Sequence, residues 1–120
     1  FNYVRTKKTP DLSQFPNLKT LIFKDCELSE IVNLQSLKNL EKLDISNTDL
    51  ETFPIEVFGL TKLTELQLFN FQEYGTENPK NIYDGLKNLK KLKSLTISED
   101  DVTEEEFKTL LPKNCYLKIY

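Results

Sequence analysis

The sequence predicts a repeat solenoid of the α/β class, in which short coils of chain stack and their strands form one parallel sheet. Two observations predict it. The pattern leucine-x-x-leucine-x-apolar recurs along the chain, and the segments between its copies carry matching apolar columns. A repeat period of about 20 to 30 residues indicates such a stacked architecture. At 120 residues and 38% hydrophobic content, the chain has room for one domain with one modest core.

The strand pattern occurs in four full copies and one partial copy. The full copies begin at Leu18, Leu40, Leu63 and Leu92, with spacings of 22, 23 and 29 residues. The partial copy is Leu117–Ile119, which lies 22 residues after Leu95–Ile97. Each copy is expected to form one short strand, and consecutive strands are expected to pair in register.

The return segments between these strands repeat as well. Two apolar columns run through them, at Leu12, Leu34, Val57 and Leu86, and at Phe15, Leu37, Leu60 and Leu89. One coil cannot bury its own apolar side, whereas stacked coils bury a continuous strip, so each position stays apolar from coil to coil. The columns therefore indicate stacking rather than an ordinary helix or strand.

These segments resemble the leucine-rich-repeat family. Residues 50–63 look like the common return segment of that family, and residues 28–37 look like its shorter, internalin-like bacterial version. The resemblance covers residues 12 to 120. It implies a right-handed solenoid with a short parallel β-sheet on the concave face and irregular or short-helical segments on the convex face.

One position departs from the family pattern. The residue three after the last apolar strand position is usually asparagine in the family, but here it is Cys26, Thr48, Phe71 and Asp100. Cysteine, threonine and aspartate can still make part of its hydrogen bonds, whereas phenylalanine cannot. Residues 72–81 follow Phe71 directly and contain turn-forming residues, so they are expected to form an inserted loop. Recognition and a tolerated surface insertion are equally compatible with this loop.

The C-terminal end is expected to form a cap. Thr103 to Glu106 is a capping-box pattern, which predicts a helix over residues 104–111 before Pro112. The alternation in residues 115–120 predicts a last strand. We expect one domain over residues 1–120, with repeats in 12–102 and the cap in 103–120. Because the sequence starts at Phe1 and contains no methionine, we expect a fragment or processed chain.

The composition argues against catalysis. The chain has no histidine, which removes histidine-dependent nucleophiles and most zinc sites. The acidic residues of 100–106 lie where a turn and a helix start need acids, and they lack the spacing of a calcium loop. The three glycines are scattered, so no phosphate-binding loop is predicted. We expect no enzyme activity, no metal and no cofactor.

The charge gives no support for nucleic-acid binding or membrane insertion. The formal net charge is -3, with 16 basic and 19 acidic residues, and no apolar run approaches the length of a membrane span. The one basic cluster is Lys87, Lys90, Lys91 and Lys93. Its interleaving with core leucines is typical of a solvated rim, and a site for an acidic ligand is the alternative interpretation.

The two cysteines are predicted to be free thiols. Cys26 belongs to the first full coil and Cys115 precedes the last strand. Four strand spacings of about 4.8 Å place them about 19 Å apart, whereas a disulfide needs a Cα separation below about 7 Å. Free thiols fit a reducing compartment such as the cytoplasm but do not require one, so a cell-surface location stays open.

A partner protein is expected to bind the concave face of the sheet. Because strand side chains alternate, the residues flanking each central leucine point outward, and continuing the alternation also exposes Ser46. The predicted binding residues are Ile22, Lys24, Asp44, Gln67, Phe69, Thr96, Tyr116, Lys118 and Tyr120. Ile22, Phe69, Tyr116 and Tyr120 are the anchor candidates. The leading hypothesis is a non-catalytic protein-recognition module, and the alternative is a structural segment of a larger repeat protein.

Overall fold

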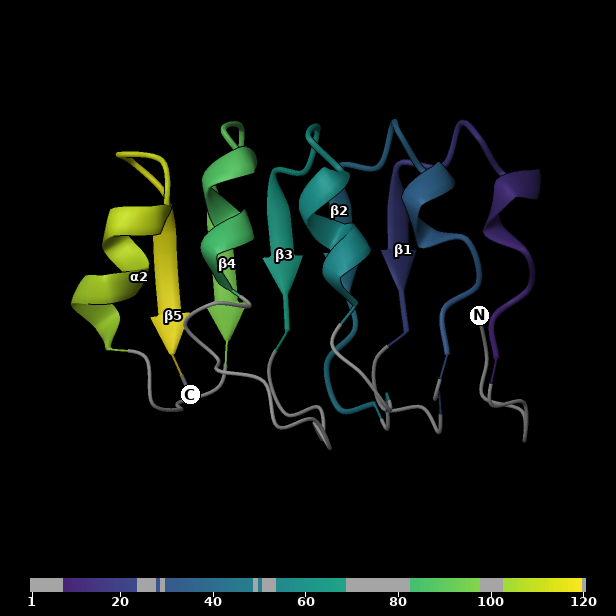
Figure 1. Ribbon diagram of the computed structural model, residues 1–120, viewed down its shortest axis with the longest axis horizontal. Helices are drawn as coiled ribbons and strands as arrows, with labels where there is room; N and C mark the ends of the chain where they lie inside the picture. The colour runs from purple at the N-terminus through teal and green to yellow at the C-terminus, as the bar shows by residue number, and fades with distance from the viewer. Residues whose placement is uncertain are drawn as a thin grey trace.

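A computed structural model describes residues 8–23, 28, 30–48, 50, 54–68, 83–97 and 103–119. Its centre is a five-stranded parallel sheet in which the strands follow one another in chain order, as Figure 1 shows. The strands are β1 (Thr20–Ile22), β2 (Lys42–Asp44), β3 (Glu65–Gln67), β4 (Ser94–Ile97) and β5 (Tyr116–Ile119). Each neighbouring pair therefore belongs to consecutive coils of a solenoid.

The register of the sheet confirms the repeat alignment. Cα partners across the sheet are the central leucines of the five copies, in the order Leu21, Leu43, Leu66, Leu95 and Leu117. The last pair of strands also matches Ile97 with Ile119. The partial copy thus pairs as a full strand, which the spacing of 22 residues predicted.

The strands are short, and the alternation of outward and inward side chains ends with each strand. In β2 the central leucine is buried while Lys42 and Asp44 are exposed or half-buried. Continuing this alternation predicted an exposed Ser46, and that prediction was wrong, because Ser46 is 0% exposed. The strand ends at Asp44, and the Asp44 carboxylate accepts a hydrogen bond from the Ser46 backbone N–H at 3.0 Å. The chain has already turned there, so strand alternation no longer applies.

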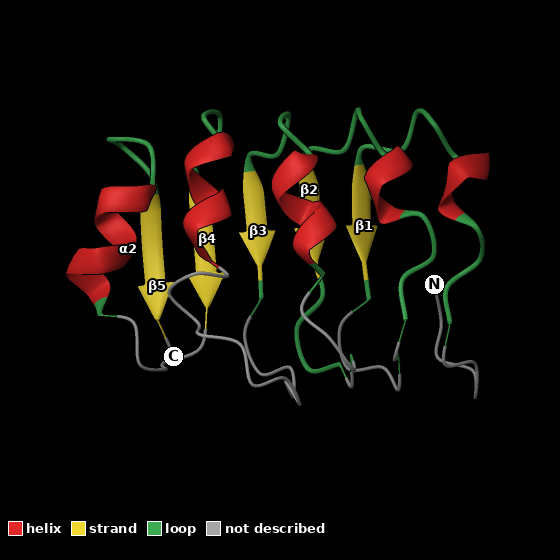
Figure 2. Ribbon diagram, in the orientation of Figure 1, coloured by secondary structure: helices red, strands yellow, loops and turns green. Residues whose placement is uncertain are grey.

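Short helices form a single layer on one face of the sheet, in front of the strands in Figure 2. Four are 3-10 helices: η1 (Leu12–Gln14), η2 (Leu34–Ser36), η3 (Ile55–Gly59) and η4 (Asp84–Asn88). Each is followed by an apolar residue whose backbone N–H donates to a carbonyl inside the helix, and these residues are Phe15, Leu37, Leu60 and Leu89. The same local geometry thus recurs at the predicted apolar columns.

Packing between the return helices follows those columns. Leu12, Leu34, Val57 and Leu86 are all buried, as are Leu37, Leu60 and Leu89. Phe15 is the exception in its column, because it lies in the first of these coils and is 44% exposed. Gly85 allows η3 and η4 to pack closely, since a Cβ at this position would collide with the Phe58 ring.

Side chains also connect the first two coils. The Asn33 side-chain amide donates to the Asp11 carboxylate at 2.8 Å, and Asp11 caps η1 by accepting from the Ser13 backbone N–H. These hydrogen bonds, with Asn33 the larger contributor, hold the pKa of the exposed Asp11 carboxyl below its ordinary value of 3.8. Thr9 adds a second link, because its hydroxyl accepts from the Val32 backbone N–H at 2.8 Å.

Thr48 shows how the chain tolerates a departure from the family asparagine. The Thr48 hydroxyl is buried and donates to the Ile45 carbonyl at 2.9 Å. A hydroxyl therefore supplies one of the hydrogen bonds that the turn requires. Cys26, Phe71 and Asp100, the other three residues at this position, lie outside the described residues, as does the predicted loop 72–81.

The predicted cap is confirmed. Helix α2 (Glu104–Leu110) begins with a capping box in which Thr103 and Glu106 each accept from the backbone N–H of the other. Its buried Phe107 packs edge-to-face on Tyr83, with ring centroids 5.1 Å apart. The helix thus covers η4, and β5 completes the sheet beside β4. Among the helices that the structure describes, none is long and apolar enough to cross a membrane.

Candidate functional site: the concave sheet face

The candidate site is the face of the sheet that turns away from the helical layer, here called the concave face. It is formed by the outward side chains of the strands: Thr20, Ile22, Lys42, Asp44, Glu65, Gln67, Ser94, Thr96, Tyr116 and Lys118. The inward leucines hold these positions, because a one-residue slip of any strand would move its leucine out of the core. The buried central leucines therefore determine which side chains of each strand face outward.

The middle of this face is polar. Lys42 and Glu65 are register partners on β2 and β3, and their charged groups lie 3.7 Å apart. Their side chains are 53% and 47% exposed, so solvent screens the pair and its contribution to stability is small. Asp44 and Gln67 are half-buried register partners on the same two strands. This region offers hydrogen-bonding groups of both signs to a partner.

The two ends of the face each present one large apolar side chain. Ile22 on β1 is 49% exposed, and Tyr116 on β5 is 63% exposed. Four strand spacings of about 4.8 Å separate them, or about 19 Å. They therefore form two separate contact points on one surface, and a single ligand would need to extend along the sheet to reach both.

The remaining predicted residues differ in their accessibility. Lys118 is exposed on β5, whereas Thr96 is only 9% exposed and adds little to the accessible surface. Thr96 lies between two register partners, Gln67 on β3 and Lys118 on β5. Lys24, Phe69 and Tyr120 lie outside the described residues.

The described residues do not assemble a reactive centre. No group of three or more histidine, cysteine, aspartate and glutamate side chains suited to a metal ion occurs within the part of the chain that the structure describes. Cys115 is a free thiol, and its partial burial raises its pKa above the ordinary value of 9.0. A thiol with a raised pKa is protonated at neutral pH and is a poor nucleophile.

One group of residues on a different surface is only partly visible in the sequence. The lysine cluster at residues 87–93 appears there as a local run. In the structure Lys62 and Lys113 lie beside this cluster, because each lines a surface hollow that is also lined by Lys90 and Lys91. The repeat alignment could have predicted this grouping of lysines, because the turn before each strand lies beside the corresponding turn of the next coil.

Comparison with known proteins supports the repeat assignment. A family profile described as "Leucine Rich repeats (2 copies)" matches residues 16–55. The platelet glycoprotein Ib alpha chain of Mus musculus is 33% identical over 91 residues, which are 76% of this chain and 12% of that protein.

A solved structure of a leucine-rich-repeat protein from Leptospira interrogans has the same fold. It superposes with a TM-score of 0.66 at 31% sequence identity. The match covers 88% of this chain and 26% of that chain. This chain thus spans about an eighth of the length of the mouse protein and about a quarter of the Leptospira chain.

Proposed function

Because the chain belongs to the leucine-rich-repeat family, we propose that it is a non-catalytic module that binds a partner protein through its concave face. The observation that carries the proposal is the exposure of Ile22 and Tyr116 on a sheet whose other outward residues are polar. Exposed apolar and aromatic side chains of this kind supply most of the binding energy at many protein interfaces. Polar neighbours then set complementarity and specificity.

The proposed face is preorganised. Each outward side chain alternates with a residue of the continuous leucine core, and the central leucines Leu43, Leu66 and Leu95 are at most 2% exposed. A partner would therefore meet a surface whose backbone does not need to be ordered on binding. Preorganisation of this kind lowers the entropic cost of association.

A structural role within a larger repeat protein is the alternative. The 44% exposure of Phe15 favours it, because this position is fully buried in the following coils. A preceding coil would cover Phe15 as Leu37 and Leu60 are covered. The coding sequence in the source genome distinguishes the two roles, because further repeats upstream would favour the structural role.

The proposed binding face can be tested with two matched isoleucines. Ile22 lies on the concave face and is 49% exposed, whereas Ile55 lies on the opposite layer in η3 and is 62% exposed. We expect Ile22→Asp to weaken partner binding by about 2 kcal/mol or more, roughly thirtyfold, because the partner would then cover a charge instead of an apolar side chain. Ile55→Asp should leave binding unchanged. Quantitative mass spectrometry of proteins captured from the source cell measures both.

Circular dichroism checks that both variants retain the fold. A partner that is retained equally by Ile22→Asp and the parent chain, but is lost with Ile55→Asp, would place binding on the helical layer instead. Equal retention by all three chains would also contradict the proposal.

A further inference from the structure

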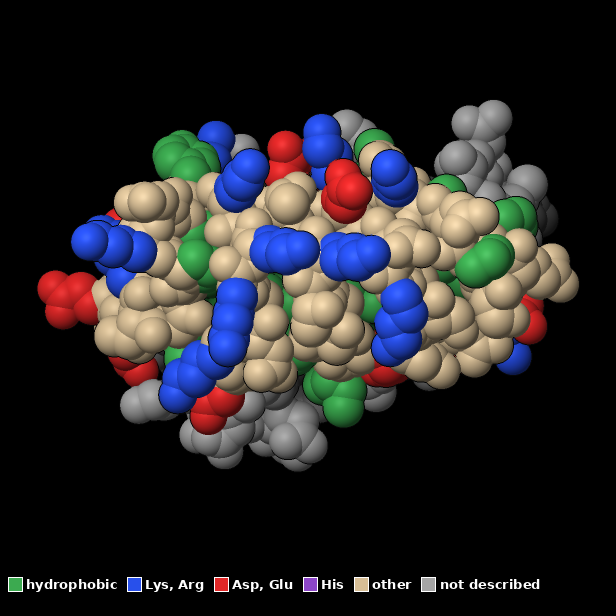
Figure 3. Space-filling view, turned by 90° about the horizontal axis from the view of Figure 1, so that it is seen from above, with side chains coloured by type: hydrophobic (Ala, Val, Ile, Leu, Met, Phe, Trp, Pro, Cys, Tyr) green, Lys and Arg blue, Asp and Glu red, His purple; other side chains and the backbone are tan. Residues whose placement is uncertain are grey.

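A second surface lies at the edge where the strands begin. Figure 3 views this edge, and lysine side chains spread across it with few acidic side chains between them. The positions are the turns between each return helix and the following strand, and we call this surface the lysine edge. Its lysines in the C-terminal half are Lys62, Lys90, Lys91, Lys93 and Lys113, and Lys87 in η4 lines one of the adjoining hollows.

The stacking of the coils brings these residues together. The Tyr116 backbone N–H donates to the Lys93 carbonyl, and the Lys93 backbone N–H donates to the Thr64 carbonyl. These bonds hold the turns of three consecutive coils side by side. Lysines that are distant in sequence, such as Lys62 and Lys113, therefore belong to one continuous edge.

Three adjacent hollows lie along this edge, with volumes of about 300, 410 and 580 Å³. Lys90 lines all three, and Lys91 lines the two larger ones. Lys93 and Lys113 line the hollow of 410 Å³. No aspartate or glutamate is among the described residues that line any of them. These hollows thus combine concave shape with charged side chains of one sign.

These positive charges are not neutralised within the described part of the chain. Ion pairs there join Lys8 to Glu30, Lys42 to Glu65 and Lys108 to Glu104. The Lys42–Glu65 pair lies at the first residues of β2 and β3, and none of these six residues lines the hollows. Lys62 instead donates to the Asn39 side-chain carbonyl at 2.8 Å, which links two coils. The ammonium groups of Lys90, Lys91 and Lys113 have no carboxylate partner among the described residues. Their mutual repulsion would be relieved by a bound anionic group.

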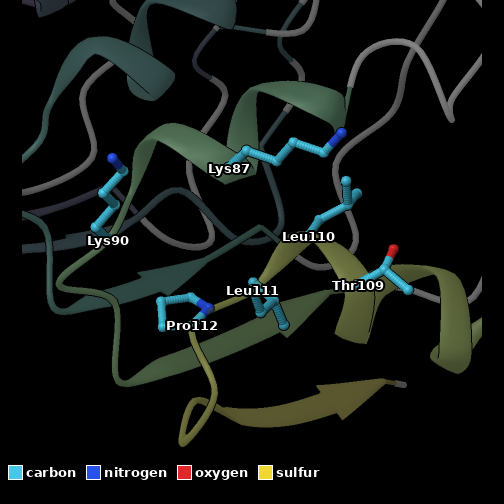
Figure 4. Close-up of a pocket in the computed structure, with 6 residues that line it drawn as sticks. All are labelled: Lys87, Lys90, Thr109, Leu110, Leu111 and Pro112. Carbon is cyan, nitrogen blue, oxygen red and sulfur yellow. The ribbon is translucent and has the colours of Figure 1, made fainter.

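The walls of the hollows are partly apolar. In the hollow shown in Figure 4, Lys87 and Lys90 lie on one side, and Leu110, Leu111 and Pro112 lie on the other. An apolar wall beside ammonium groups suits a ligand that carries both an apolar side chain and carboxylates. Phosphodiester and sulfated polymers offer the charge but no such apolar group.

We propose that the lysine edge binds an extended acidic segment of a partner protein in which an apolar side chain accompanies the carboxylates. The turns that carry Lys62 and Lys113 are two coil spacings apart, about 10 Å, which an extended segment covers with about three residues. Single-stranded nucleic acid fits less well, because its binding uses exposed aromatic rings for base stacking. Phe58, the one aromatic residue among those lining the three hollows, is only 7% exposed.

The test compares two double variants that change the net charge equally. Lys90→Gln/Lys91→Gln alters the lysine edge, and Lys8→Gln/Lys108→Gln removes two lysines from other surfaces. The probe is a short fluorescein-labelled peptide of glutamates interrupted by leucines, and fluorescence anisotropy at low salt measures its binding. We expect the parent chain and Lys8→Gln/Lys108→Gln to bind alike. Lys90→Gln/Lys91→Gln should bind about five- to tenfold more weakly, because two exposed charge interactions are lost.

Three further probes decide the class of ligand: a leucine-free glutamate peptide, a thymidine oligonucleotide and a heparin oligosaccharide, each of similar length. The proposal expects all three to bind more weakly than the glutamate–leucine peptide. Equal or tighter binding of any of them would overturn it, as would equal losses in the two double variants or no binding by the parent chain. Ile22→Asp should bind the peptide normally, which separates this surface from the concave face.

Discussion

Replacing Phe107 by alanine is expected to lower the free energy of unfolding by about 3 to 5 kcal/mol. The Phe107 side chain is 0% exposed and packs edge-to-face on Tyr83, so truncation would leave a cavity between α2 and η4. The aromatic pair itself contributes about 0.5 to 1.5 kcal/mol beyond area burial. Urea denaturation followed by circular dichroism measures the change.

The damage should also be local. In a repeat stack each coil contacts only its neighbours, so loss of the cap is expected to expose the last coils first. Hydrogen exchange should show faster exchange in α2, β5 and β4 while β1 and β2 stay protected. Lys108→Ala is the matched control, since its exposed pair with Glu104 contributes only about 0.3 to 0.5 kcal/mol. A loss below about 1 kcal/mol for Phe107→Ala would mean that α2 is not a cap.

Replacing Leu66 by alanine is expected to cost about 2 to 5 kcal/mol. Leu66 is 0% exposed on the central strand, with Leu43 and Leu95 as its register partners. Because both neighbouring coils pack on it, the substitution should accelerate hydrogen exchange on both sides of β3. The same urea titration measures the loss of stability.

Gln67→Ala is the control for Leu66→Ala. Gln67 is the next residue on the same strand, but its side chain lies on the concave face and is half-buried. Its truncation should change the free energy of unfolding by no more than about 0.5 kcal/mol. Similar losses at the two positions would contradict the assignment of inward and outward faces.

The sequence was sufficient to predict the sheet register and the cap. The periodicity of the leucines predicted which side chains of each coil face the core, because leucines repeat wherever coils stack. The repeat spacing alone places Leu117 beside Leu95. The cap was predictable because a capping box is a local pattern from Thr103 to Glu106. Both features depend on residues that are near in sequence or equal in repeat position.

Features that depend on where an element ends, or on which side chains meet, were not predictable. Ser46 is buried because β2 stops two residues earlier, and Thr96 is covered although it lies on the outward face. The lysine edge needed the stacking of turns from three coils, whereas the sequence showed only the run at residues 87–93. Phe15 shares its repeat position with the buried Leu37, Leu60 and Leu89 but is 44% exposed, which the apolar column did not predict.

If the partner contacts the concave face, a photoreactive side chain placed on that face should form a covalent bond with it. A photoreactive phenylalanine analogue at position 116 replaces an exposed ring on this face, and the same analogue at position 55 lies on the helical layer. Irradiation with the captured partner should give a covalent adduct from position 116 and none from position 55. An adduct from position 55 with none from position 116 would contradict recognition through the sheet.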